Sequence, residues 1–312
     1  MGKFKNKVVF ITGSSKGIGK STAVELLRRG AKVVLNGRNI HVLNRTAKEL
    51  GRIAEESEKG RTAEGGKIAN SREIADSHEN TDVEQIADNR KVTDGMEIMQ
   101  ISGDMSDPES FEQAINAIVE RFGRLDILIL NAGLSSYGTV ERTGDQTLYN
   151  VMKANTLGPF TGARIALPHI RKTKGSIVFI SSLAGLHGIP HSSVYSMSKM
   201  ALTALAQSLK TELTGQGIHI GILYIGFTQN DPEKMAVGPD GRIRPIQSRP
   251  GWVQQSTQKV ARLILRNISR RKFRSTLSTM GKTMAFFSRY FPRLFQLSMR
   301  GMLKQAEKLT AD

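Results

Sequence analysis

Two residues of the sequence could together carry proton chemistry. Tyr195 and Lys199 are four residues apart in a stretch whose apolar pattern predicts a helix, so both side chains would lie on one face. A phenol with a pKa of about 10 is a poor base at neutral pH, and lowering that pKa by one unit requires about 1.4 kcal/mol of preference for the phenolate. A neighbouring ammonium group supplies such a preference. The spacing therefore permits an acid/base pair with Lys199 as the activator, although a Tyr and a Lys four residues apart are not specific for one on their own.

A glycine-rich turn near the N-terminus could hold a phosphate group. The sequence Thr-Gly-Ser-Ser-Lys-Gly-Ile-Gly at 12–19 follows an apolar run and precedes a helical pattern. Glycines permit a tight turn and a close approach of the backbone to a pyrophosphate, and the helix N-terminus offers N–H groups and a positive dipole end. This context predicts a dinucleotide site with contacts from Gly13, Ser15, Lys16, Gly17, Ile18 and Gly19.

The end of the second strand-like run bears on which dinucleotide would bind. It reads Leu-Asn-Gly-Arg at 35–38 and lacks the acidic residue that NAD-selective sites usually place there for the ribose 2′-hydroxyl. Arg38 and Lys16 could instead pair with a 2′-phosphate. The alternative is that both are solvated surface cations. The sequence favours NADP(H) over NAD.

Four motifs occur in a specific order along the chain. The glycine turn is followed by Asn-Ala-Gly at 131–133, by a serine pair at 181–182, and by Tyr-x-x-x-Lys at 195–199. Their order and spacing resemble the short-chain dehydrogenase/reductase family over nearly the whole chain, except a polar insertion and the C-terminal segment. The resemblance implies a Rossmann-type fold and an oxidoreductase.

The resemblance also implies roles for single residues. Ser182 corresponds to the serine that donates a hydrogen bond to the substrate oxygen, because its separation from Tyr195 matches the family better than that of Ser181. Tyr195 corresponds to the acid/base, and Lys199 to its activator, which also reaches the nicotinamide ribose. Asn155 corresponds to the residue that holds a proton-relay water. Hydride would move between nicotinamide C4 and the carbinol carbon.

Further cofactor contacts follow from the same resemblance. The family places an Asp beside the adenine, here Asp104 next to Met105, and it uses the turn Asn131-Ala132-Gly133 and a glycine after the sixth strand, here Gly226. An Asn-Ala-Gly turn can also be explained without a ligand. The chain departs from the family at Ile225, where Pro is common, and at Asn230, where a Thr often contacts the cofactor.

Short apolar runs alternate with helical patterns along most of the chain. This alternation predicts an α/β fold, a single Rossmann-type domain over residues 1–280 with a doubly wound parallel sheet. Asp107 is a predicted helix N-cap. The expected strands are 8–11, 33–35, 98–101, 125–130, 177–180 and 218–223, and the expected helices are 17–29, 108–121, 193–213 and a long one that ends near Pro168.

Three segments depart from this alternation. Residues 51–95 contain no aromatic side chain and predict a polar surface insertion, partly helical or disordered. Residues 227–255 are rich in Pro and Gly and predict a substrate lid. Residues 281–312 predict a basic amphipathic helix, kinked or restarted at Pro292. Its basic face would carry Lys282, Arg289, Arg293, Arg300 and Lys304, opposite Met284, Phe291, Phe295 and Met302.

The charge distribution limits the partners. The formal net charge is +17, and residues 259–308 hold thirteen Lys/Arg against Glu307 as their one acid. Two hypotheses fit this segment: peripheral contact with an anionic membrane, or packing on its own domain or a partner subunit. Motifs that read nucleic acid are not visible, so nucleic acid is not an expected partner.

Other function classes are disfavoured by composition. The chain has no cysteine, which excludes disulfides and thiolate chemistry, and no His/Asp/Glu cluster has convincing metal spacing, so no metal is expected. No apolar run approaches the roughly 20 residues of a membrane-spanning helix. The N-terminus leads almost directly into the first strand, so we expect no signal peptide and a cytoplasmic location, with or without peripheral membrane contact.

The sequence as a whole predicts an NADP(H)-dependent oxidoreductase that interconverts a hydrophobic ketone and a secondary alcohol, such as a lipid, long-chain keto or steroid-like molecule. The predicted lid and basic segment motivate the apolar substrate. One alternative is a 3-oxoacyl thioester reductase, whose acidic carrier protein would dock on the basic surface. The other is a non-catalytic NADP-binding or membrane-associated regulator, favoured by Ile225 and Asn230 alone. The resemblance suggests a homodimer or homotetramer.

Overall fold

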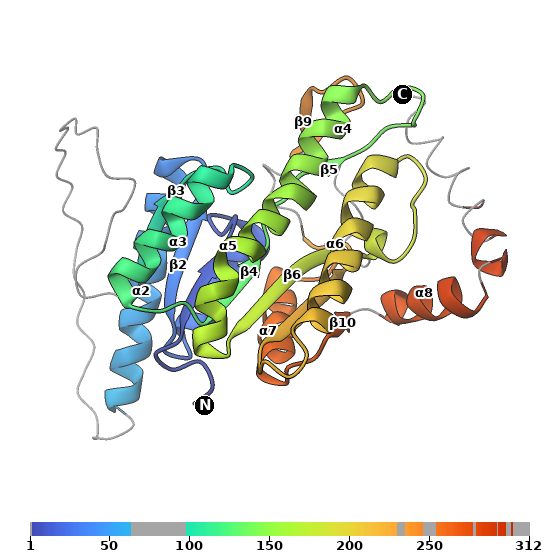
Figure 1. Ribbon diagram of the computed structural model, residues 1–312. Coiled ribbons are helices and arrows are strands. Elements are labelled where there is room, and N and C mark those ends of the chain that lie inside the picture. Colours follow the sequence, from blue (N-terminus) through green and yellow to red (C-terminus); the bar gives the residue numbers. More distant parts are fainter. Residues whose placement is uncertain are drawn as a thin grey trace.

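The computed structural model describes residues 2–63, 98–229, 235–245, 254–276, 279–291, 293–297 and 301. Its centre is a seven-stranded parallel sheet with the order β10-β7-β6-β4-β1-β2-β3 (Figure 1). The strands are β1 Val8–Ile11, β2 Lys32–Gly37, β3 Ile98–Ser102, β4 Ile127–Leu130, β6 Ser176–Ser182, β7 His219–Ile225 and β10 Arg274–Thr276. The predicted α/β fold is confirmed.

Alternating side chains of the strands build two separate cores, one on each face of the sheet. Phe10 belongs to the first core, whereas its neighbours Val9 and Ile11 belong to the second. Both faces are therefore apolar, which explains why the strands read as continuous apolar runs. The first core is covered by α3 Pro108–Phe122, α5 Gly158–Thr173 and α6 Ser193–Glu212, and the second by α1 Gly17–Leu27, α2 Ile40–Ala63 and α7 Thr257–Ser269.

Local sequence signals predict the ends of some helices correctly and the ends of others incorrectly. Asp107 caps α3 as predicted, because its carboxylate accepts a hydrogen bond of 2.8 Å from the Ser110 N–H. The expectation that a helix ends near Pro168 is wrong, since α5 continues to Thr173. Pro168 removes one backbone hydrogen bond, but Ile170 beyond it is fully buried in the first core, and this packing keeps the chain helical.

The predicted motifs gather at the carboxyl edge of the sheet. The strand order reverses between β1 and β4, and helices leave these strands toward opposite faces. Such a switch point opens a crevice in which doubly wound proteins bind their ligands. The glycine turn follows β1, Arg38 follows β2, Asp104 follows β3, Asn131 follows β4, Ser182 ends β6 and Gly226 follows β7.

The insertion and the lid are each described only in part. The first residues of the predicted insertion continue α2 to Ala63, and residues 64–95 lie outside the described part of the chain, as does Asn230. The described middle of the lid is a regular hairpin of β8 Met235–Val237 and β9 Ile243–Pro245, not an irregular loop. Strand β8 also pairs with β5 Ser135–Ser136, and strands of two or three residues leave no periodic pattern in the sequence.

The C-terminal segment contains helix α8, Thr279–Tyr290, which lies at one side of the molecule beyond α6 and β10 (Figure 1). The predicted apolar face does not point in one direction. Met284 packs against the first core and Phe295 is only 8% exposed, whereas Phe291 is 48% exposed. The other predicted members, Met302, Arg300 and Lys304, have no described side chains.

Candidate active site

The glycine turn is shaped so that a phosphate can approach it. Gly13 has a φ of +62°, and a Cβ there would lie 2.9 Å from Ala132 Cα, so only glycine fits. A Cβ on Gly19 would lie 2.5 Å from the Gly13 carbonyl oxygen. Gly17, by contrast, has a φ of +55° and open space where its Cβ would be. The open side of the turn thus faces the N-terminus of α1 at Gly17, as pyrophosphate binding requires.

Two asparagines hold this turn in place. Asn36 Oδ1 accepts a hydrogen bond of 3.0 Å from the Gly13 N–H, and its Nδ2 donates to the Ile101 and Gly103 carbonyls of the next strand. Asn131 Nδ2 donates to the Thr12 and Gly13 carbonyls, both at 2.9 Å. The side chain of Asn131 therefore has a structural function. Asn36 was not predicted, although an amide inside an apolar strand is a usable signal.

A cationic cavity of about 360 Å³ lies beside the turn, between α1 and α2. Lys16 and Arg45 line it, and Thr46 closes it by donating a 2.8 Å hydrogen bond to the Ser15 carbonyl. Arg38 is exposed at the end of β2 and does not line this cavity, but a Cβ on the preceding Gly37 would lie 3.0 Å from Ser15. The sequence analysis missed Arg45, because its position depends on how α2 packs on the turn.

Ser182 and Tyr195 meet at the end of β6. The two hydroxyls lie close enough to interact. Burial raises the pKa of Tyr195 above its usual range, and the Ser182 hydroxyl acts in the opposite direction. The neighbouring Ser181 points away from this pair, because its hydroxyl donates to the Lys199 carbonyl at 3.2 Å. The structure thus brings Ser182, and not Ser181, to the phenol.

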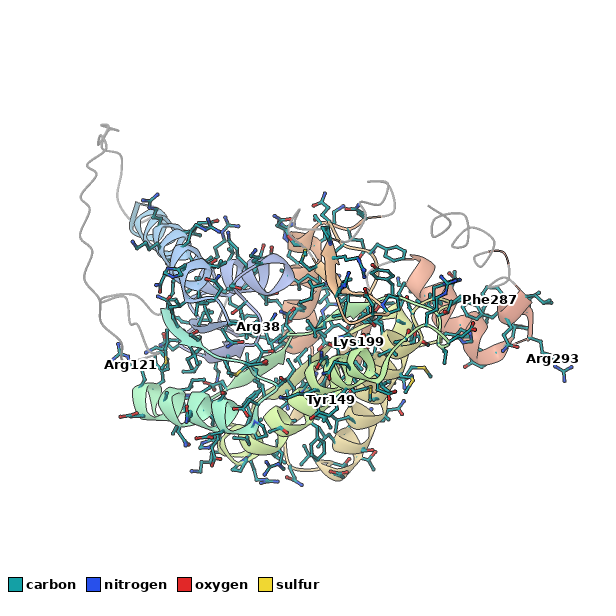
Figure 2. All side chains as sticks on the ribbon, turned by 90° about the horizontal axis from the view of Figure 1, so that it is seen from above. Arg38, Arg121, Tyr149, Lys199, Phe287 and Arg293 are labelled. Carbon is teal, nitrogen blue, oxygen red and sulfur yellow. The ribbon has the colours of Figure 1, made fainter. Side chains whose placement is uncertain are left out.

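Lys199 lies behind the phenol on the same helix. Its side chain is buried, Nζ donates to the Ile180 carbonyl at 3.2 Å, and Nζ lies 5.8 Å from the centre of the Tyr195 ring. A Cβ on Gly133 would lie 3.4 Å from this Nζ and 2.8 Å from Asn155 Oδ1. Three predicted motifs therefore converge at one point near the middle of the molecule, where Figure 2 labels Lys199.

Asn155 lies in a π-helical turn, Lys153–Leu157, between α4 Asp145–Met152 and α5. Its fully buried amide accepts a 2.7 Å hydrogen bond from the Leu134 N–H and donates to the Leu134 carbonyl at 2.8 Å. It also donates to Ser198 Oγ at 3.0 Å, and Ser198 Oγ donates to the Tyr195 carbonyl at 2.7 Å. Ser198 was not predicted, although it stands inside the Tyr-x-x-x-Lys motif.

A comparison with known families decides what this arrangement belongs to. The model of the short chain dehydrogenase family matches residues 7–64 and 69–237, which is more than half of the chain. The protein belongs to the short-chain dehydrogenase/reductase family. An uncharacterized oxidoreductase of Thermotoga maritima is 34% identical over 251 residues, covering 79% of this chain and 83% of that protein. Dehydrogenase/reductase SDR family member 7B of Rattus norvegicus is 28% identical over 306 residues, covering 97% and 83%.

Solved structures of this family share the fold at 21% identity. A short chain dehydrogenase/reductase from Burkholderia phymatum in complex with NAD has a TM-score of 0.69 and covers 94% of this chain and 96% of its own. An alcohol dehydrogenase from the archaeon Thermococcus sibiricus, complexed with 5-hydroxy-NADP, has a TM-score of 0.65 and covers 88% and 96%. This short-chain dehydrogenase/reductase is thus an oxidoreductase with the family fold.

Some predicted cofactor contacts of this short-chain dehydrogenase/reductase have other partners within the chain. Asp104 is exposed, and its Oδ1 accepts hydrogen bonds from the Ser106 N–H at 2.9 Å and hydroxyl at 2.8 Å. Met105 beside it is buried. Gly226 directly follows β7, as the family pattern requires. Among the described residues, no three His, Asp or Glu side chains come together as metal ligands.

Proposed function

We propose that the protein is an NADP(H)-dependent oxidoreductase that interconverts a hydrophobic ketone and a secondary alcohol. The observation that carries the proposal is the closeness of the Ser182 and Tyr195 hydroxyls, with the Lys199 ammonium 5.8 Å from the centre of the phenol ring. A nicotinamide bound at the carboxyl edge of the sheet would supply or accept the hydride. The residues of the chain then need only orient the substrate oxygen and move one proton.

Each side chain has a distinct task in that step. The Tyr195 hydroxyl donates the proton to a carbonyl oxygen during reduction and takes it back during oxidation. Ser182 donates a second hydrogen bond to the same oxygen and holds the substrate in position. A free phenol with a pKa of about 10 already holds its proton at neutral pH, and burial raises the pKa of Tyr195 further, so the hydroxyl can donate a proton during reduction. Lys199 places a positive charge where a phenolate would form.

The preference for NADP(H) is supported by the charge around the glycine turn. Lys16 and Arg45 line one cavity, and Arg38 stands beside the same turn. Strand β2 ends with Asn36 and Gly37 and is followed by Arg38. No acid therefore stands directly after the strand to bind a ribose 2′-hydroxyl. Glu49 also lines the cavity, but Lys20 pairs with it at 2.6 Å. The cationic side chains can therefore contact a 2′-phosphate.

An apolar substrate is supported by the lid hairpin and its neighbours. The β8–β9 hairpin is fixed beside the start of α6, because Gly138 packs on Pro239 and its N–H donates to the His191 carbonyl at 2.9 Å. Exposed apolar side chains surround this contact, including Val140 at 75% and Ile243 at 62%. A hydrophobic ketone could bury this surface on binding.

Turnover tests the enzyme assignment. We would follow NADPH oxidation by nicotinamide absorbance with long-chain keto-lipids, steroids and small ketones, comparing wild type with Tyr195→Phe. Tyr149→Phe is the matched control, because Tyr149 is 60% exposed on α4. Loss of the Tyr195 hydroxyl should reduce kcat about 10²- to 10⁴-fold, and the control should not. Equal turnover of wild type and Tyr195→Phe would refute the mechanism, and tight NADPH binding without turnover would favour a regulator.

Cofactor preference is tested by the ratio of kcat/KM for NADPH to that for NADH. Lys16→Gln, Arg38→Gln and Arg45→Gln should each lower this ratio about tenfold, as expected for the loss of one charge-assisted contact to phosphate. The control is Arg52→Gln, which removes an exposed arginine on α2. A wild-type ratio near one would disprove the NADP(H) preference.

A homodimer or homotetramer is part of the same proposal. It is supported by exposed apolar side chains around the starts of two helices, with Leu157 and Phe160 at α5 and Met197 and Met200 at α6, all between 45% and 52% exposed. Light scattering on the purified protein gives the mass directly, and a monomer at micromolar concentration would contradict the assembly.

A further inference from the structure

The C-terminal segment is attached to the domain by part of its surface. Met284 packs against the first core, and Phe295 is nearly buried with its ring 4.6 Å from that of His187. His187 belongs to the loop between Ser182 and Tyr195. The described part of the segment is therefore a folded element held against the body of the protein.

A second side of the same segment is apolar and exposed. We define the aromatic ridge as Phe286, Phe287, Tyr290, Phe291, Leu294 and Leu297, whose exposed fractions lie between 38% and 61%. The four rings contact one another, with centroids 5.0 to 6.0 Å apart. The contacting pairs are one, four or five residues apart, with Phe286, Phe287 and Tyr290 on α8 and Phe291 directly after it. A contiguous apolar surface of this kind marks an interaction site.

The charge around the ridge selects one class of partner. Residues 279–306, the stretch of sequence that contains the ridge, have no Asp or Glu and five Lys/Arg, at 282, 289, 293, 300 and 304. Lys282 lies one helical turn before the ridge and Arg293 lies between Phe291 and Leu294, and both side chains are exposed. Two copies of the segment placed face to face would bring like charges together, so a second copy is a poor partner.

We propose that the aromatic ridge binds to the surface of an anionic lipid bilayer. Aromatic and leucine side chains enter the boundary between headgroups and acyl chains, and cations beside them attract anionic lipid at about 1 kcal/mol each. No helix in the described part of the chain is both long and apolar enough to cross a membrane. The segment would therefore lie in the plane of the membrane surface, with Met284 and Phe295 facing the protein.

This inference deepens the proposed function, because it names the source of the apolar substrate. A cavity of about 840 Å³ separates the segment from the start of α6, and Leu297 and Arg293 face Met197 and Met200 across it. Binding at the membrane surface places this cavity beside the acyl chains. Figure 2 shows Phe287 and Arg293 at the edge of the molecule and Lys199 near its middle, so the ridge can touch a membrane without covering the candidate active site.

The direct test is co-sedimentation of the full-length protein with vesicles. Vesicles of phosphatidylcholine alone are compared with vesicles that also contain phosphatidylserine, at low and high salt. The proposal expects binding to the anionic vesicles, at least tenfold weaker binding to the neutral ones, and loss of binding at high salt because the charge is screened. Equal binding to both vesicle types, or no binding to either, would overturn it.

Matched variants assign the binding to the ridge. Tyr290→Ser and Tyr149→Ser remove the same side chain at 61% and 60% exposure, one on the ridge and one on α4. Arg293→Gln and Arg121→Gln remove exposed arginines that lie at opposite edges of the molecule (Figure 2). The ridge variants should weaken binding about fivefold each, which corresponds to about 1 kcal/mol, and the controls should not.

Two further measurements separate the alternatives. Far-ultraviolet circular dichroism of each variant checks that the fold is kept, and light scattering reports its mass. A ridge variant that changes the oligomeric mass and leaves vesicle binding intact would assign the ridge to subunit contact and overturn the membrane proposal. NADPH turnover of a water-soluble ketone without vesicles tests the proposed function separately, and Tyr290→Ser should retain it.

Discussion

Asn155 and Ser198 are joined by a buried hydrogen bond of 3.0 Å, although 43 residues separate them in the chain. Through this bond the π-helical turn of Asn155 is attached to the second turn of α6, where Ser198 in turn donates to the Tyr195 carbonyl at 2.7 Å. The Asn155 amide therefore holds the backbone of Tyr195 in place through Ser198. Ser198 is a positioning residue on this basis.

Ser198→Ala tests this connection. We expect kcat to fall about tenfold with an unchanged KM for NADPH, because the phenol loses its position while the cofactor contacts remain. Ser196→Ala is the control, since Ser196 is also buried but accepts its hydrogen bond from the Ile189 N–H. Both variants should lose about 1 kcal/mol of stability. If both reduce kcat equally, Ser198 contributes to stability alone.

The two adjacent serines should behave differently when each is replaced by Ala. Ser182→Ala removes the hydroxyl that contacts Tyr195, and we expect kcat to fall about 10²- to 10³-fold. Ser181→Ala removes a buried bond to the Lys199 carbonyl and should lower the free energy of unfolding by about 1 kcal/mol with little change in kcat. Steady-state kinetics and urea unfolding of both variants check this. A reversed order would assign the catalytic role to Ser181.

Two glycines form a matched pair for the cofactor site. Gly17 and Gly123 both have a left-handed φ, +55° and +70°, and both have open space where a Cβ would lie. Replacing either with Ala should cost about 1 kcal/mol of strain. Gly17→Ala should also weaken NADPH binding at least tenfold, because the new methyl group occupies the approach to the turn. Calorimetric titration measures this affinity, and an equal affinity in the two variants would place the phosphate elsewhere.

Asp126 should give the protein a pH-dependent stability. Burial raises its pKa, but hydrogen bonds from Arg124, Lys7 and the Val8 N–H outweigh burial and hold the pKa below its usual value. The stabilisation is thus complete above the unfolded-state pKa of about 3.9 and is lost as the pH falls through the lower folded-state value.

Removing the Asp126 carboxylate by mutation should reduce this pH dependence of stability. Asp126→Asn leaves the half-exposed Arg124 beside a neutral group and should lower the free energy of unfolding by about 2 kcal/mol at pH 7, with a smaller further loss than in wild type as the pH falls below about 4. Glu112→Gln, an exposed change on α3, is the control. Denaturant unfolding at several pH values measures both, and parallel curves for wild type and Asp126→Asn would contradict this account.

The sequence predicted the sheet well because each parallel strand is buried on both faces. Strand β1 was expected at 8–11 and spans Val8–Ile11, and the Asp107 cap was read correctly from its side chain. Such features depend on neighbouring residues. Strand β8 pairs with distant β5 as well as with its neighbour β9, so the pairing with β5 could not be read from nearby residues.

Site residues were predictable where they belong to a sequence motif, and they were not predictable where their position depends on packing. Tyr195 and Lys199 were found as part of a motif, and the structure brings Lys199 to the Asn155 amide and Gly133 and connects Tyr195 to Asn155 through Ser198. Arg45 reaches the cavity beside the glycine turn only because α2 packs there. The burial of the C-terminal segment could not be predicted for the same reason. Hydrophobic periodicity alone does not tell which of its apolar side chains are buried and which are exposed.

The ring contact between His187 and Phe295 has an evolutionary consequence. It ties the loop in front of Tyr195 to the far end of the chain at a centroid distance of 4.6 Å. A change in the size of either ring must be accommodated by the other, so we expect positions 187 and 295 to vary together among descendants of this sequence. A lineage that loses the C-terminal segment would then need compensating changes in the loop between Ser182 and Tyr195. The segment and this loop would therefore be inherited together.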